Sequence, residues 1–276
     1  MSDAIKSQAP VAAQACEHPG LDRAADYADG LFETIAFHRG HAPFWEWHMQ
    51  RLQRDAARLL LQLPMPAELL QQANALAAGK DCVLRLTVSR AHGQGYWPLL
   101  DVNDGQQCLS SCKLHWQRRV MPSPKRGGVQ VAIANLQLAS QPLLAGIKHL
   151  ARLEQVLAAT EAQRRKLDEL LLCDQGGFLV EAISSNVLVY LDRQWLTPEL
   201  DDCGVSGVLR AWLLARGLIS EARLHRSELD RATALALCNS VRGIQRVSVY
   251  AGRPLLDEAA VKLLDAAVSK HILVCT

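Results

Sequence analysis

The chain has 276 residues, of which 49% are hydrophobic and 21% are charged, and its formal net charge is +2. These values describe an ordinary soluble globular protein of one or two domains, and they give no reason to expect nucleic acid or a membrane surface as a partner. No apolar run reaches the length of a membrane span, and residues 1–10 lack the apolar centre of a signal peptide.

The eight cysteines are scattered, and Cys108 and Cys112 form the closest pair. No second pair stands ready to complete a zinc site, so we predict no metal site. We interpret the cysteines as reduced thiols that mostly fill packing positions, which favours a cytoplasmic location.

The predicted elements of the N-terminal part mix strands and helices. Residues 1–20 have no periodicity, and we expect them to be poorly ordered. A hairpin turn is expected at Arg39-Gly40 and a loop at residues 91–96. The spacing of apolar residues predicts strands at 31–37, 83–89 and 112–118, and helices at 45–61 and 67–78.

Residues 121–128 contain two prolines, two glycines and two cations, which is typical of an exposed linker. We therefore predict an N-terminal domain at 1–120 and a C-terminal domain at 129–276. The second domain is expected to contain a strand at 129–134, a long helix that ends near 166, a hairpin of 169–174 and 178–181, and strands at 186–191 and 234–238.

Lys148 lies between apolar neighbours, just before the long helical pattern. Desolvation disfavours the ammonium and lowers its pKa, so the amine becomes available as a nucleophile or base. Such an amine can form a Schiff base with a carbonyl group. The ordinary alternative is a lysine at a helix start whose charged end reaches water.

Three later segments carry polar groups at element ends. Glu181 closes the apolar strand at 178–181, and a carboxylate there needs a partner unless it reaches water. Residues 203–210 combine two glycines with a hydroxyl and a helix onset, which suits a nest of backbone N–H groups for an anion. The alternative is a plain turn with Ser206 as the helix N-cap. Asn239 and Ser240 follow a strand with further donors.

Together these groups meet the needs of pyridoxal 5′-phosphate (PLP). A lysine amine can hold its aldehyde, backbone donors and an arginine can hold its phosphate, and a carboxylate can hold its protonated ring nitrogen. Arg51, in the middle of the first predicted helix, is such an arginine, although a surface arginine is the ordinary interpretation at that position.

The chain resembles the fold-type IV PLP enzymes, a group that includes branched-chain and D-amino-acid transaminases and aminodeoxychorismate lyases. The resemblance runs from about Asp22 to the C-terminus. It rests on Tyr27-Ala28-Asp29-Gly30-Leu31-Phe32-Glu33-Thr34-Ile35 and on His48-Met49-Gln50-Arg51-Leu52. The segment Gly146-Ile147-Lys148-His149-Leu150-Ala151-Arg152-Leu153-Glu154-Gln155-Val156 is most similar to that of the lyases.

This resemblance implies an α+β fold, with a smaller N-terminal α+β domain and a larger, β-rich C-terminal α/β domain. It also implies a homodimer whose cofactor lies between the domains. Lys148 would bind the cofactor covalently, Glu181 would pair with the pyridinium nitrogen, and Arg51 would bind the phosphate. The resemblance assigns the remaining phosphate donors to Val205, Ser206, Asn239 and Ser240.

The implied reaction converts 4-amino-4-deoxychorismate to 4-aminobenzoate and pyruvate in folate biosynthesis. Lys148 would be the base, and Thr34 is a candidate proton donor to the leaving group. Ala28, Gln94 and Ala151 depart from the pattern of the lyases. The alternatives are a transaminase of the same fold, acting on D-amino or branched-chain amino acids, and a non-catalytic binding protein.

Overall fold

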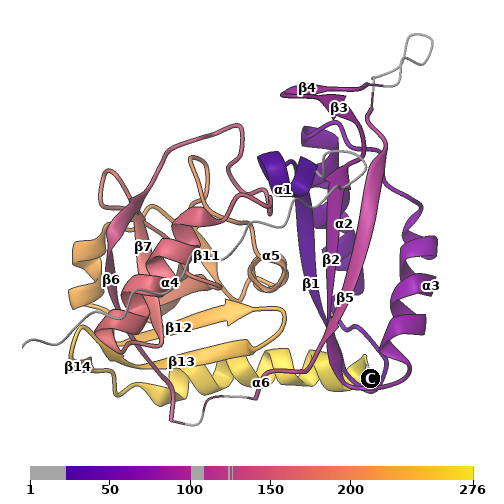
Figure 1. Cartoon of the computed structure of the whole chain (residues 1–276). Helices are drawn as coiled ribbons and strands as arrows, with labels where there is room; N and C mark the ends of the chain where they lie inside the picture. The colour runs from indigo at the N-terminus through magenta and orange to yellow at the C-terminus, as the bar shows by residue number, and fades with distance from the viewer. Residues whose placement is uncertain (1–22, 101–108, 124, 126, 276) are drawn as a thin grey trace, which may run out of the picture.

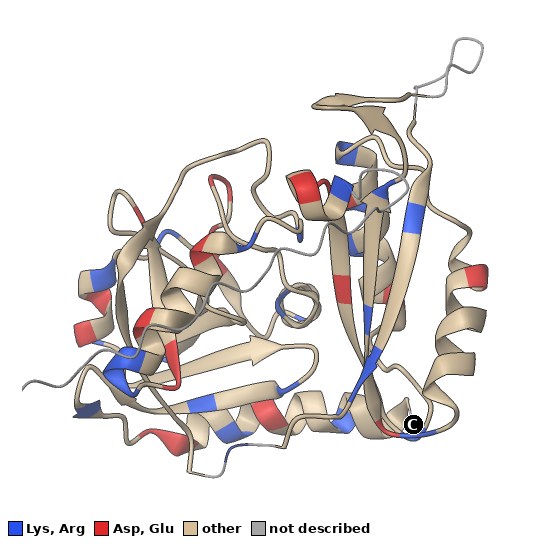
Figure 2. Cartoon of the chain, in the orientation of Figure 1, with Lys and Arg blue, Asp and Glu red and all other residues tan. Residues whose placement is uncertain are grey.

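The computed structural model of the chain describes residues 23–100, 109–123, 125 and 127–275. Residues 1–20, for which the sequence predicts poor order, lie outside this range. The described residues form the predicted mixture of helices and strands, arranged in two parts that stand side by side (Figure 1). Basic and acidic residues are spread over both parts (Figure 2). None of the described helices is long and apolar enough to span a membrane.

The N-terminal part is built on a three-stranded antiparallel sheet in the order β1-β2-β5, with helices on one face (Figure 1). Its elements are α1 (Arg23–Tyr27), β1 (Gly30–Phe37), α2 (Trp45–Arg58), α3 (Pro66–Ala77), β2 (Cys82–Arg90) and β5 (Cys112–Arg119). Because strand side chains alternate between faces, Ile35 and Leu84 share one apolar core with Leu52 of α2. The other face of the sheet is left free to form one wall of a cavity.

The C-terminal part is built on a nine-stranded mixed sheet in the order β11-β10-β9-β12-β13-β6-β7-β8, with β14 beside β13. Its strands are β6 (Val129–Leu138), β7 (Glu169–Asp174), β8 (Leu179–Ala182), β9 (Asn186–Leu191), β10 (Gln194–Pro198), β11 (Ser220–Ala222), β12 (Ala234–Asn239), β13 (Gly243–Tyr250) and β14 (Arg253–Pro254). Side chains from β7, β8, β9, β12 and β13 share one core, so the sheet curves around them.

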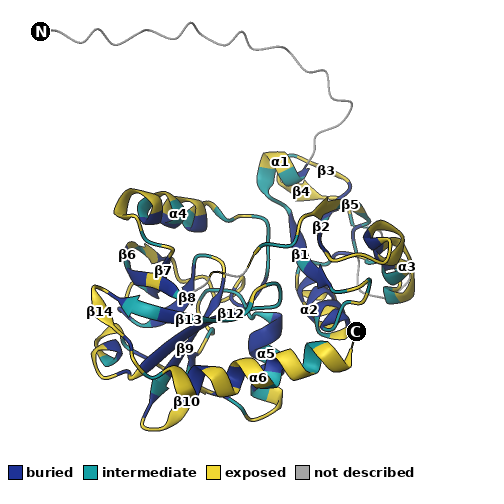
Figure 3. Cartoon of the chain, turned by 90° about the horizontal axis from the view of Figure 1, so that it is seen from below, coloured by how far each residue is buried: buried dark blue, intermediate teal, exposed yellow. Residues whose placement is uncertain are grey.

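Helices cover this sheet from outside. They are α4 (Leu153–Arg165), α5 (Val208–Ala215), α6 (Glu258–Val274) and a 3₁₀ turn at Arg226–Asp230. Ala158 and Ala162 of α4 pack in one core with residues of β6 and β7, while Trp212 of α5 and Leu264 of α6 pack in another with β12. The strands are largely buried, and the outward faces of α4 and α6 are exposed (Figure 3).

Most predicted elements occur within a few residues of the expected bounds. The first long helix ends at Arg58 instead of 61, because Leu60 adopts a left-handed conformation with φ of 55°. Arg39 and Gly40 both have positive φ and form the expected tight turn between His38 and His41. The expected loop at 91–96 instead includes the strand β3 (Gly93–Gln94), which forms a short hairpin with β4 (Trp97–Pro98) just after it.

Two structural details concern the predicted boundary and the lysine. The chain leaves the small sheet at Arg119 and enters the large sheet at Val129, but the proposed domain limits themselves stay a prediction.

The helix after Lys148 begins at Leu153, so the lysine does not start a helix. It lies in an irregular segment that pairs with β1 through the bridge between Leu31 and His149.

Candidate active site

A cavity of about 520 Å³ lies between the two parts of the molecule. Its wall from the small sheet includes Phe32 and Thr34, and its wall from the large sheet includes Glu181. The predicted site residues that line it are Thr34, Arg51, Lys148, Glu181, Val205, Asn239 and Ser240. Ser206 is not among the described lining residues. The fold therefore brings together side chains that are up to about two hundred positions apart in the sequence.

Lys148 is held through its backbone from two sides. Its N–H donates to Asp55 Oδ2 of α2 at 3.0 Å, and its carbonyl accepts from Phe32 N–H of β1 at 3.1 Å. The Nζ atom lies 4.1 Å from the centre of the Phe32 ring. Burial, assisted by Arg51, lowers the pKa of Lys148 to about 7, against the opposing attraction of Glu33. The amine is thus partly neutral near neutral pH and free to act as a nucleophile.

Arg51 is fixed by a buried carboxylate. It donates from Nε to Glu33 Oε1 at 2.8 Å and from Nη2 to Glu33 Oε2 at 2.5 Å. His48 Nδ1 contacts Glu33 Oε2 at 2.6 Å. Burial raises the pKa of Glu33, but Arg51 and His48 together outweigh it and bring the pKa to about 2. Glu33 is therefore ionised, which requires His48 to carry its proton on Nδ1.

Glu181 faces neutral partners instead. Its Oε1 accepts from Gln155 Nε2 at 3.0 Å and its Oε2 accepts from the N–H of Val205 at 2.8 Å. Burial raises the pKa of Glu181, and the charge of Arg152 opposes this only in part. A buried carboxylate without an ion-pair partner is stabilised by any cationic group placed in the cavity beside it. The protonated ring nitrogen expected from the sequence is such a group.

The expected nest at 203–210 differs from the prediction. The N–H of Val205 is used by Glu181, and the N–H of Ser206 donates to the carbonyl of Gly146 at 3.1 Å. Helix α5 is capped by Gly207, without a side-chain hydrogen bond, and not by Ser206. A Cβ at position 207 would lie 1.9 Å from Asn186 Oδ1, so a larger residue there would have to displace the Asn186 side chain. Gly207 and Val208 line the cavity, so the unpaired N–H groups of the first turn of α5 are the nearer anion donors.

The side chain of Asn239 shapes a loop. Its Oδ1 accepts from the N–H groups of Val241 at 3.0 Å and Arg242 at 2.7 Å, and its Nδ2 donates to Ser185 Oγ at 3.0 Å. These bonds leave the amide little capacity for a ligand. The next residue, Ser240, carries a hydroxyl and lines the cavity.

Sequence reasoning assigned no role to Glu33, His48, Asp55 or Gln155. Glu33 could have been singled out, because it is a charged residue inside an otherwise apolar strand. Asp55 lies four positions after Arg51, on the same face of α2. Gln155 lies in the segment that resembles the lyases, but no local pattern indicates that its side chain contacts Glu181.

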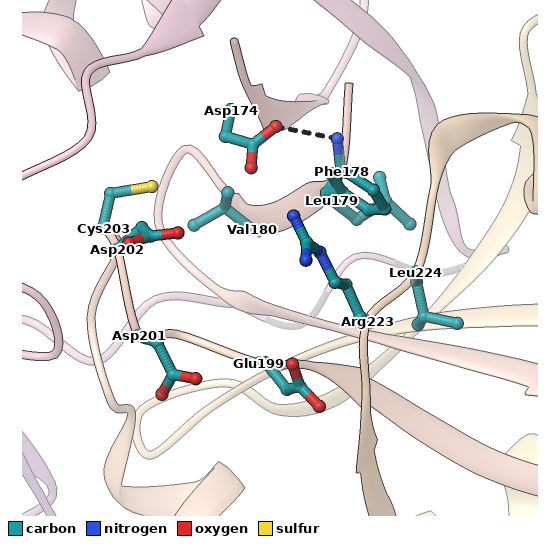
Figure 4. A pocket seen from close by; sticks show the side chains of 10 residues that line it. All are labelled: Asp174, Phe178, Leu179, Val180, Glu199, Asp201, Asp202, Cys203, Arg223 and Leu224. Carbon is teal, nitrogen blue, oxygen red and sulfur yellow. Dashed lines mark hydrogen bonds between the residues drawn. The ribbon is translucent and has the colours of Figure 1, made fainter. Parts of the chain in front are cut away.

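A second pocket, of about 90 Å³, lies at the other end of β8 (Figure 4). Asp174, Glu199, Asp201 and Asp202 surround it, and the guanidinium of Arg223 lies 4.1 Å from the Phe178 ring. It contains no lysine, so the chemistry expected from the sequence belongs to the larger cavity.

A family model described as amino-transferase class IV matches residues 30–250. The chain belongs to this family. It is 30% identical over 241 residues to an aminodeoxychorismate lyase of Vibrio harveyi, which covers 82% of this chain and 85% of that protein.

Solved structures agree with this family. The structure of 4-amino-4-deoxychorismate lyase from Pseudomonas aeruginosa is similar with a TM-score of 0.81 and 35% identity, covering 93% of this chain and 96% of that chain. A hypothetical aminotransferase from Mycobacterium tuberculosis, in a PLP-bound form, has a TM-score of 0.76 and 22% identity, covering 93% and 95% of the two chains. At that identity, the second match shows the fold alone.

Proposed function

We propose that this protein is a PLP-dependent lyase that converts 4-amino-4-deoxychorismate to 4-aminobenzoate and pyruvate. The observation that carries the proposal is Lys148, whose amine faces the cavity with its pKa lowered to about 7 and with the buried carboxylate of Glu181 in the same cavity. The relative from Vibrio harveyi and the structure from Pseudomonas aeruginosa, which are 30% and 35% identical and cover 82% and 93% of this chain, are lyases of this type.

The cavity fits the cofactor residue by residue. Lys148 would hold the aldehyde carbon, and Glu181 would hold the ring nitrogen in its protonated form. Arg51, the first turn of α5 and Ser240 would hold the phosphate. When bound, PLP supplies an electron sink for negative charge that develops on the substrate.

The chain's own residues then move protons and position the substrate. Lys148 takes the proton from the ring carbon that bears the substrate nitrogen, because an amine with a pKa of about 7 both accepts and releases protons near neutral pH. The enolpyruvyl group leaves with the electrons of its carbon–oxygen bond, and the ring becomes aromatic. Protonation of the released enolate at carbon gives pyruvate. Thr34, on the cavity wall, is the proposed donor of that proton.

We further propose a homodimer. Leu153, Val156 and Leu157 are 70%, 57% and 53% exposed, and they form one apolar stripe at helical spacing on α4. Tyr96 and Trp97, on the β3–β4 hairpin, are 85% and 79% exposed. Apolar surface of this kind is typical of protein–protein contacts. Sedimentation at several protein concentrations tests this point.

The role in folate biosynthesis and the cytoplasmic location belong to the same proposal. They follow from the proposed reaction and from the interpretation of the cysteines as reduced thiols. The six cysteines in the described residues are free.

The first experiment is the absorption spectrum of the purified protein with added PLP, followed by 4-aminobenzoate formation from 4-amino-4-deoxychorismate. We expect a cofactor band that borohydride removes, together with product formation. A band without product, combined with amino transfer from an amino acid to 2-oxoglutarate, would favour the transaminase alternative. A wild-type protein that shows no cofactor band would contradict both the lyase function and the transaminase alternative.

A further inference from the structure

The face of the small sheet that borders the cavity carries two arginines. Arg85 of β2 lies directly opposite Thr34 of β1, and Arg119 of β5 lies opposite Val83 of β2. Directly opposed residues share a face, as do residues two apart on one strand, so all four side chains belong to the same face. Thr34, Val83 and Arg119 line the cavity. Arg85 is not itself among the described lining residues, but its neighbours on β1, β2 and β5 belong to the cavity wall.

Neither arginine contacts a carboxylate within the part of the chain that the structure describes. Arg119 donates twice to the neutral Gln117 Oε1, at 3.0 Å from Nε and 2.6 Å from Nη2. Arg85 is half-buried, and its guanidinium lies 3.9 Å from the centre of the Phe32 ring. Burial and the charge of Arg119 both lower the pKa of Arg85. Two neighbouring cations without a counter-ion are stabilised by a bound anion.

The fully buried arginines of this protein differ from Arg85 in this respect. Arg23 donates to Asp29 at 2.9 Å, Arg51 is held by Glu33, and Arg210 contacts Glu221. Complete burial of an arginine in this fold is thus accompanied by an acid from the chain itself, whereas the half-buried Arg152, which also lines the cavity, donates to the backbone carbonyls of Ile147 and His149. At Arg85 the planar guanidinium has no acidic partner among the described residues, so its N–H donors are available to a bound anion.

The position of this site relative to Lys148 defines the ligand. Lys148 Nζ and the guanidinium of Arg85 both approach the Phe32 ring, at 4.1 and 3.9 Å from its centre. The amine nitrogen and the guanidinium carbon are therefore at most about 8 Å apart, on either side of or above the same ring. The amine nitrogen and the carboxylate at opposite ends of one six-membered ring are separated by less than this limit, so a single such ring can contact both groups.

We propose that Arg85 and Arg119 form the subsite for the ring carboxylate of the substrate, the one opposite the amine. This assignment rests on the proposed lyase function and specifies its substrate recognition. The carboxylate does not react and is retained in 4-aminobenzoate. Its contacts are the same before and after the chemical step, so they lower KM and bind product while leaving kcat nearly unchanged.

The test measures binding of 4-aminobenzoate and of the neutral 4-aminobenzamide to the PLP-loaded protein by calorimetry. We expect Arg85→Gln to weaken 4-aminobenzoate binding about 10- to 100-fold, as for a lost hydrogen-bonded charge pair, and to leave 4-aminobenzamide binding unchanged. Arg119→Gln should cause a smaller loss, because Arg119 is exposed. Arg85→Lys keeps the charge but loses the bidentate geometry, so its affinity should lie between those of the wild type and Arg85→Gln.

Arg118→Gln is the matched control. It removes the same charge from the adjacent position of β5, on the opposite face of the sheet, where Trp116 contacts Gln72 of α3. Its binding of both ligands should equal that of the wild type. Figure 2 shows the basic residues at this end of β5.

Two results would overturn the subsite. In the first, Arg85→Gln binds 4-aminobenzoate as the wild type does; in the second, it loses affinity for both ligands equally, which would indicate a structural role. If either occurs while the wild type forms 4-aminobenzoate, the lyase function stands without this subsite. A wild type that neither binds nor forms 4-aminobenzoate would overturn the function and the subsite together.

Discussion

Two groups of charged residues around the cavity are held in opposite ways. On the wall from the small part, Arg51 is paired with Glu33 at 2.8 and 2.5 Å, and the pKa of Glu33 is about 2. On the wall from the large part, Glu181 has only neutral hydrogen-bond partners and a raised pKa, and Lys148, in the irregular segment that pairs with β1, has its pKa lowered to about 7. The Arg51–Glu33 pair is suited to holding a ligand in place, and the unpaired Lys148 and Glu181 are suited to chemistry.

This difference suits the roles proposed for these groups. A phosphate-binding arginine needs a fixed orientation, which a bidentate buried carboxylate provides. A nucleophilic lysine needs to lose its proton, and a partner carboxylate would prevent this. Glu181 and Lys148 line one cavity without a direct ion pair between them among the described contacts, which keeps both groups available.

The largest effect is expected from Lys148→Ala. Loss of the amine should reduce 4-aminobenzoate formation by at least about 1,000-fold, because the covalent attachment and the base are lost together. The borohydride-sensitive band should disappear as well. Lys166→Ala, at the exposed C-cap of α4, is the control and should retain both. Substantial activity in Lys148→Ala would place the reactive amine elsewhere.

Glu181→Gln should be next in magnitude. The amide cannot hold a protonated ring nitrogen by charge, so we expect kcat to fall on the order of 100-fold while PLP still binds. Because burial raises the pKa of Glu181, its ionised form destabilises the cofactor-free fold as pH rises through that pKa. The same variant should therefore be as stable as the cofactor-free wild type at pH 7, or more so, by thermal unfolding. A loss of stability together with unchanged kcat would contradict this role.

Glu33→Gln tests the buried ion pair between Glu33 and Arg51. It leaves a buried arginine without its acid, which should cost about 3 kcal/mol in the free energy of unfolding. We also expect weaker binding of PLP, because the guanidinium of Arg51 is no longer fixed. Denaturant unfolding and PLP titration measure the two effects. Glu46→Gln, at an exposed position in the first turn of α2, should change neither. Unaltered stability in Glu33→Gln would show that the pair is not a structural element.

The smallest effect concerns pH. The pKa of Lys148 is lowered in the folded state from its ordinary value of 10.5 to about 7, so the folded state binds fewer protons than the unfolded state between these values. The stability of the cofactor-free protein should therefore rise with pH over this window, by about 1–2 kcal/mol between pH 7 and pH 9 after allowance for partial exposure. Lys148→Met should lack this contribution when both proteins are unfolded with urea. Equal pH profiles would contradict the shift.

The amino-acid sequence was sufficient for the elements and for much of the chemistry. The alternation at 31–37 and the helical spacing of Met49, Leu52 and Ala56 depend on local geometry, and both elements occur as predicted. The apolar surroundings of Lys148 are also local, so its lowered pKa could be anticipated. The α+β class and the family follow from motifs that retain their order along the chain.

Only the tertiary structure decided which polar groups are already engaged. The N–H of Val205 is used by Glu181, although the sequence presents it as a free donor. Glu33 pairs with Arg51 across eighteen positions, and Arg85 meets Phe32 from a different strand. Hydrogen bonds and ion pairs depend on distances of a few ångströms between segments remote in the sequence, and no periodic pattern encodes them. The sequence therefore determined which groups are present, and folding decided which of them remain free to bind and react.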